Sequence, residues 1–111
     1  MDPSGRRVRM SRDTWHGQVL PEHPELKGHL ADVRTALREP DLAEWDTWDP
    51  NTVLYYKLNL RPGHGLGNHL RVVVRFGSFA KLQVPLYGPI GGEVVSAYFV
   101  SRPKGGSPYE G

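Results

Sequence analysis

Histidine, arginine, serine and tyrosine are the residues of this sequence whose side chains suit chemistry on a phosphate ester. Three of the five histidines lie in the short stretch HGQVLPEHPELKGHL, and the central one is His23. Arg71, Arg75, Ser96 and Tyr98 occur later, in segments where polar and apolar residues alternate. Histidine exchanges protons near neutral pH, and arginine binds phosphate oxygens in pairs. Whether these side chains meet depends on the elements that position them.

Four segments of the second half have the alternating pattern of half-buried strands: TVLYYKLNL, HLRVVVRFG, AKLQVPLYG and GGEVVSAYFVSR. We expect their apolar positions to face the core, among them Leu54, Tyr56, Leu58, Leu60, Val72, Val95, Ala97 and Phe99. The opposite face would then carry polar residues and no carboxylate. These are Lys57, Asn59, Arg71, Arg75, Lys81, Gln83, Ser96 and Tyr98.

Such a face has the composition of a surface for RNA or DNA, with cations for the phosphates and a flat ring for a base. Lys57, Asn59, Arg75 and Lys81 are the candidate substrate-binding residues, and RNA, including tRNA, is the expected partner. A solvated antiparallel sheet also exposes alternating lysine and arginine, so an ordinary surface stays an open interpretation.

The same residue types suit RNA cleavage without a metal or a cofactor. A base removes the 2′-hydroxyl proton, cations stabilise the phosphorane, and an acid protonates the leaving 5′-oxygen, which leaves a 2′,3′-cyclic phosphate. Histidine fits the acid or base, and Arg71 or Arg75 would hold the phosphate. Ser96 and Tyr98 would orient the phosphate or the hydroxyl. We predict no metal site, because His64 and His69 lack a third ligand.

The first half of the chain predicts helices. From Pro24, apolar residues recur at helical spacing up to Pro40, which predicts a helix of about four turns that begins after His23. A shorter helix is expected around residues 13–20. As a helix-start residue His23 needs no chemistry. Residues 41–50, DLAEWDTWDP, are interpreted as a linker or a short acidic turn of helix.

Composition indicates one domain in 111 residues with net charge +2 and no cysteine. We expect a flexible basic arm at 1–12, a single α+β domain at 13–102 and a flexible tail at 103–111. The fold expected is one or two N-terminal helices packed on a four-stranded antiparallel sheet. No apolar run is long enough for a membrane span and no secretory signal is evident, which predicts a cytoplasmic protein that does not contact membranes.

The motifs HPEL, at the helix start, and SAYF, in the last strand, support a family resemblance together with LYY and LRVVV between them. Over about residues 13–104 the sequence resembles the PBECR family, phage-associated relatives of the barnase, EndoU, colicin and RelE nucleases. The resemblance implies a BECR or RelE-like fold and a metal-independent endoribonuclease of toxin or phage-effector type. It also implies a catalytic site at His23, Arg71, Ser96 and Tyr98, and an antitoxin or immunity protein as a possible partner.

A non-catalytic role is the alternative. The same basic face would serve an RNA-binding or protein-interaction module, such as a regulator of a phage or mobile element. The position of His23 bears on the choice, because this residue can act only if the helix start lies beside Arg71, Ser96 and Tyr98.

Overall fold

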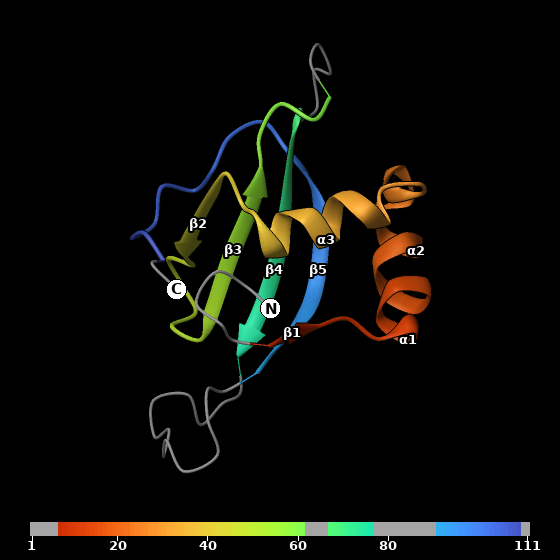
Figure 1. Cartoon of the computed structure of the whole chain (residues 1–111), viewed down its shortest axis with the longest axis horizontal. Helices are drawn as coiled ribbons and strands as arrows, with labels where there is room; N and C mark the ends of the chain where they lie inside the picture. Colours follow the sequence, from red (N-terminus) through yellow and green to blue (C-terminus); the bar gives the residue numbers. More distant parts are fainter. Residues whose placement is uncertain (1–6, 62–66, 77–90, 110–111) are drawn as a thin grey trace.

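A five-stranded mixed sheet with helices on one face and at one edge forms the molecule (Figure 1). The computed structural model describes residues 7–61, 67–76 and 91–109. The strand order is β1-β5-β4-β3-β2, where β2 to β5 pair antiparallel and β1 pairs parallel with β5. The strands are β1 Val8–Arg9, β2 Leu42–Trp45, β3 Thr52–Lys57, β4 His69–Phe76 and β5 Gly92–Val100. The predicted α+β class is confirmed, but the expectation of four antiparallel strands is wrong.

The two strands that the sequence did not predict lie at the edges of the sheet. β1 falls within the predicted basic arm, and its Val8 and the following Met10 pack against the core. β2 falls within the predicted linker and pairs with β3 over four residues. Both are short, so alternation has little length in which to show. The strand predicted in AKLQVPLYG lies outside the described residues.

The strand register differs from the prediction in β3. The face packed against the helices, here called the inner face, includes Val53, Tyr55, Val72 and Ala97. Tyr56 instead pairs with Arg71 and lies on the opposite, outer face, as does Leu54. The prediction that Leu54 and Tyr56 line the helix-covered core is therefore wrong. Because β3 is buried on both faces from residue 52 to 56, its sequence gives no contrast between them.

A bulge in β5 explains a second difference. The register between β4 and β5 shifts at Val73/Val74, where Val73 pairs with Ser96 and Val74 pairs with Val94. Val95 is the extra residue, so Val94 takes the buried inner position that the alternation assigned to Val95. A bulge of one residue reverses the faces of all positions before it, which a strict alternation cannot anticipate.

The helices form a column beside β5 and a bar across the inner face (Figure 1). The column is continuous from residue 12 to 22, through α1 Arg12–Thr14, the π-helix η1 Trp15–Val19 and α2 Leu20–Glu22. The predicted helix after His23 is divided into the 3₁₀ turn η2 Pro24–Leu26 and α3 Leu30–Arg38, since Gly28 takes φ +86°. None of the helices among residues 7–61, 67–76 and 91–109 has the length and apolar composition of a membrane span.

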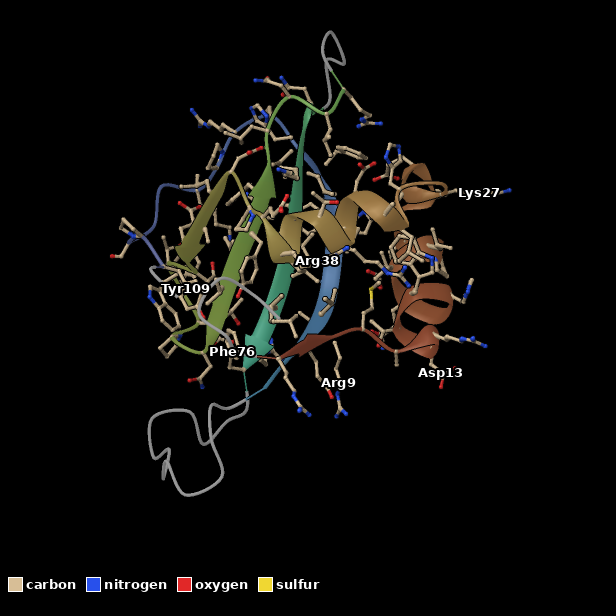
Figure 2. All side chains as sticks on the ribbon, viewed as in Figure 1. Arg9, Asp13, Lys27, Arg38, Phe76 and Tyr109 are labelled. Carbon is tan, nitrogen blue, oxygen red and sulfur yellow. The ribbon has the colours of Figure 1, made fainter. Side chains whose placement is uncertain are left out.

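Residues 101–109, here called the C-terminal strap, run from the end of β5 to the free edge of β2. Trp45 N donates to Ser107 O at 2.8 Å, and Tyr109 N donates to Ala43 O at 2.9 Å. The Tyr109 ring packs against the rings of Trp45 and Phe76 (Figure 2). The structure thus differs from the flexible tail expected at 103–111, because residues up to 109 extend and cover the sheet.

Candidate functional site

The guanidinium of Arg71 lies near the middle of the outer face and is the centre of the candidate site. Its Nε donates to Tyr56 Oη at 2.9 Å, its Nη1 to Tyr98 Oη at 3.3 Å and its Nη2 to the Arg102 carbonyl at 3.3 Å. Arg71 is only 7% exposed, and no carboxylate of the described residues lies within ion-pair distance. A buried cation without an acid is costly unless something else compensates its charge.

The compensation comes from Glu44, through a phenol. Tyr56 is fully buried and donates to Glu44 Oε1 at 2.8 Å while it accepts from Arg71. The strap supports the carboxylate, because Lys104 N donates to Glu44 Oε1 at 3.0 Å. Burial, and then the hydrogen bond to Glu44, raise the pKa of Tyr56 to about 12. We call the set Glu44, Tyr56, Arg71 and Tyr98, with the backbone of Arg102 and Lys104, the Arg71 network.

His23 joins this network through Tyr98. Between α2 and η2 the chain turns at the sheet edge beside β5, and there the His23 and Tyr98 rings lie 5.1 Å apart between centroids, tilted by 30°. Tyr98 Oη accepts from Arg71, so the hydrogen of its own hydroxyl is left for another acceptor. The structure therefore brings three of the four predicted catalytic residues into contact. The π-helix η1 and the short helix α2 position His23, because α2 ends at the residue before His23.

Glu25 is a neighbour of His23 that the sequence interpretation did not include. Its Oε1 lies 3.5 Å from His23 Nδ1, and both side chains are partly exposed, at 38% and 29%. A carboxylate at Nδ1 favours the tautomer that carries its hydrogen there and leaves Nε2 as the basic nitrogen. The sequence signal that could have found this neighbour is the spacing of His23 and Glu25, one residue on each side of Pro24.

Ser96, the fourth predicted catalytic residue, lies one step away from this contact. It pairs with Val73 and shares the outer face with Tyr98, two positions along β5. Its hydroxyl makes no side-chain hydrogen bond within the described residues. Ser96 therefore borders the Arg71 network without belonging to it.

The predicted substrate-binding residues do not form one surface. Lys57 is not on the outer face as predicted, because it alternates with Tyr56 onto the inner side, where it donates to Glu39 O at 2.9 Å and to Asp41 Oδ1 at 3.3 Å. Asn59 is not part of the strand as predicted: it lies beyond β3 with φ +57°, and its side-chain carbonyl accepts from Asn68 Nδ2 at 3.1 Å. The register of β3 explains the position of Lys57, and the end of β3 at Lys57 explains that of Asn59.

Arg75 is on the outer face as predicted, and Lys81 lies outside the described residues. The predicted absence of carboxylates from that face is wrong. Arg75 lies 3.5 Å from Asp49, and Glu93 pairs with Arg75 across the strands. These acids, with Glu44, lie in β2, in the turn after β2 and in β5 before the bulge. The alternating pattern assigned none of these positions to the outer face. The outer face is thus a mixed surface around one buried cation.

Comparisons with protein-family models, with curated proteins and with solved structures gave no match. In the part of the chain that the structure describes, no group of three His, Asp or Glu side chains could hold a metal ion. Function is therefore inferred from the geometry around His23, Tyr98 and Arg71.

Proposed function

We propose that this protein is a small metal-independent ribonuclease of the PBECR type, with a BECR or RelE-like fold and a toxin or phage-effector role. It would cleave RNA to a 2′,3′-cyclic phosphate. The observation that carries the proposal is the buried Arg71 guanidinium, held by two phenols and a carbonyl, with the His23 ring against one of those phenols. Fixed donors in a desolvated site stabilise developing negative charge much better than solvated ones.

Arg71 has the role of phosphate clamp. A guanidinium has five N–H donors, and three of these are used within the protein, which leaves two for non-bridging phosphate oxygens. The Arg71 network fixes the plane of the guanidinium before substrate arrives. That preorganisation makes the charge available to the phosphorane without a reorganisation cost.

His23 and Tyr98 have the roles of base and acid. His23 Nε2 takes the proton of the 2′-hydroxyl as its oxygen bonds to phosphorus, and Glu25 stabilises the resulting imidazolium through Nδ1. The bond from phosphorus to the 5′-oxygen breaks, and Tyr98 gives that oxygen a proton. Arg71 already donates to the Tyr98 oxygen, so it stabilises the phenolate that remains. Ser96 would hydrogen-bond the substrate next to this centre.

The test is cleavage of total RNA and of tRNA by the purified protein in EDTA, with the product ends analysed for 2′,3′-cyclic phosphate. His23→Gln should lower the cleavage rate by about 10²-fold or more, the range of a lost general base. His16→Gln is the matched control, since His16 is an exposed histidine of η1. Equal rates for wild type and His23→Gln would remove His23 from the mechanism.

A non-catalytic RNA-binding or protein-interaction module is the second candidate function. The strap favours it, because Arg102 and Lys104 close over the Arg71 network and leave Arg71 little exposed. In the same assay, intact RNA together with binding that weakens as salt rises would select this function over cleavage.

A further inference from the structure

The outer face continues beyond the Arg71 network in ordered rows across the strands. Arg71 pairs with Tyr98 in the first row, and Val73 pairs with Ser96 in the second. The third row crosses three strands, from Arg75 on β4 through Glu93 on β5 to Arg9 on β1.

Arg75 is four residues after Arg71 along β4, so their Cα atoms lie about 13 Å apart at the rise of a strand. Successive phosphates of one strand of double-stranded DNA lie about 3.4 Å apart along the helix axis, and at that spacing the separation corresponds to about four nucleotides.

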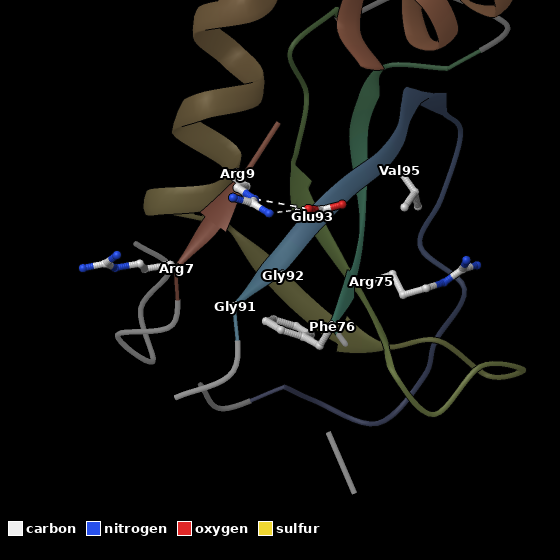
Figure 3. A pocket seen from close by; sticks show the side chains of 8 residues that line it. All are labelled: Arg7, Arg9, Arg75, Phe76, Gly91, Gly92, Glu93 and Val95. Carbon is white, nitrogen blue, oxygen red and sulfur yellow. Dashed lines mark hydrogen bonds and ion pairs between the residues drawn. The ribbon is translucent and has the colours of Figure 1, made fainter. Parts of the chain in front are cut away.

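An open pocket of about 660 Å³ lies at the third row. Arg7, Arg9 and Arg75 line it, and Glu93 is the acid among its lining residues. Figure 3 shows Arg7 and Arg75 on opposite sides of β5, with the Arg9 and Glu93 pair between them. Gly92 forms part of the wall, and a Cβ there would lie 2.7 Å from the Val74 side chain. The backbone of β5 therefore packs closely on the core side chains Val74 and Phe76 at this position.

The charge of the pocket is positive even after its ion pairs are counted. Arg9 Nη2 lies 2.8 Å from Glu93 Oε1, and Arg75 Nε lies 3.5 Å from Asp49 Oδ2. The Arg9 pair is exposed on both sides and the Arg75 side chain is exposed in the second, so each pair is weak and can exchange for a stronger anion. Arg7 has an exposed side chain and no ion pair with a described residue. An arginine fork suits phosphate better than a single carboxylate oxygen, since it can bind two oxygens at once.

We infer that Arg75, Arg9 and Arg7 form a second phosphate subsite, which binds the RNA strand about four nucleotides from the bond cleaved at Arg71. The inference rests on the proposed function for the position of the scissile bond. The strand crosses the outer face over Val73 and Ser96, and the subsite makes the protein select single strands of at least about five nucleotides. The subsite reads the backbone and carries no preference for base.

The experiment measures binding without cleavage, by fluorescence anisotropy with 2′-O-methyl oligonucleotides of two, four, six and eight residues. These probes lack the nucleophilic hydroxyl, so binding is read whether or not the protein is an enzyme. We expect affinity to rise about tenfold or more between two and six residues. Arg75→Gln should remove most of that gain and leave the dinucleotide affinity nearly unchanged. Glu93→Gln should raise the hexanucleotide affinity a few fold, because it frees Arg9.

Arg38→Gln is the matched control, an exposed arginine at the end of α3, away from the outer face (Figure 2). Equal affinities for the dinucleotide and the hexanucleotide would overturn the subsite, and so would a loss in Arg38→Gln as large as that in Arg75→Gln. A length-dependent gain that Arg75→Gln removes supports the subsite even if natural RNA stays uncut, in which case only the proposed catalysis fails. Cleavage of RNA without any length dependence of binding would overturn the subsite and leave the proposed catalysis intact.

Discussion

Arg71 and Arg75 lie on the same strand and the same face, yet their charges are in opposite environments. Arg71 is buried, is held by neutral acceptors and reaches Glu44 only through Tyr56. Arg75 is exposed and has Asp49 as a direct partner. Exposed ion pairs contribute little to stability, whereas a buried cation without an acid is expensive. The comparison shows that Arg75, which has a direct carboxylate partner, has an ordinary surface environment. Arg71, which has none, needs a specific set of neighbours.

The difference also shows why the number of cations on a face is a poor guide to function. In the sequence, the alternating pattern assigns both arginines to the outer face and does not distinguish them. The structure distinguishes them by their surroundings: a network built from β2, β3, β4, β5 and the strap for Arg71, and a solvated pair for Arg75. A group whose environment is this specific is a candidate for chemistry.

The largest effect expected is on catalysis by Arg71→Ala. We expect the cleavage rate to fall by about 10²- to 10³-fold, close to 3–4 kcal/mol of transition-state stabilisation, because a fixed donor to the phosphorane is lost. Single-turnover rates on a short RNA measure it, with circular dichroism as a check that the variant folds. Arg38→Ala is the control for a change of net charge. A full rate in Arg71→Ala would make Arg71 a structural cation and remove the contrast with Arg75.

An intermediate effect is expected in alkaline solution from Tyr56. The pKa of Tyr56 is about 12 in the folded protein, above the ordinary value of 10.0. The neutral phenol therefore contributes fully to folding stability below pH 10, and this contribution is lost as pH rises toward 12. A shift of this size corresponds to roughly 2–3 kcal/mol. Urea unfolding from pH 9 to 12 should show the stabilities of wild type and Tyr56→Phe converging as pH rises. Parallel curves would mean that burial and the hydrogen bond to Glu44 do not raise the pKa of Tyr56 in the folded protein.

The smallest effect concerns the inner side, where Lys57 and Asp41 form a structural pair. The hydrogen bond from Leu58 N lowers the pKa of Asp41 against the opposing effect of burial, and Lys57 lowers it further. Its contribution to stability is therefore present above pH 3.8 and is lost as pH falls through the lowered value. In Asp41→Asn, the free energy of unfolding should fall less steeply as pH is lowered than in wild type. The difference should be less than about 1 kcal/mol, since the pair is partly exposed, and urea unfolding at acid pH measures it.

Lys57→Gln extends this last test to the site. Unfolding at pH 7 should change by a few tenths of a kcal/mol, and RNA cleavage should keep its wild-type rate. A loss of cleavage in Lys57→Gln comparable with that in Arg71→Ala would return Lys57 to the substrate-binding residues and contradict the register of β3.

Alternation in the sequence predicted β4 and β5 because their two faces differ, with valines on one side and Arg71, Arg75 or Tyr98 on the other. It could not resolve β3, since Leu54 and Tyr55 are equally buried on opposite faces. The bulge at Val95 and the left-handed Gly28 depend on backbone geometry that periodicity does not encode.

The candidate site was predicted in part. His23 lies against Tyr98, and Tyr98 accepts from Arg71, so three residues of the expected set lie close together. Glu44 and Tyr56 were missed. The former lay in a segment interpreted as a linker, and the latter was assigned to the core, where a phenol would have little to bond. Buried polar partners of this kind depend on tertiary contacts between residues far apart in the chain.

The order in which the chain is synthesised gives the Arg71 network a further meaning. Its members are spread from Glu44 to Lys104, and His23 lies still earlier. Half of the network is present early, but the phenol that contacts His23 and the strap that supports Glu44 come last. A nascent chain still short of residue 98 cannot bring His23 and Arg71 together through Tyr98. The contact between His23 and Arg71 through Tyr98, on which the proposed activity depends, can therefore form only after synthesis has passed residue 98.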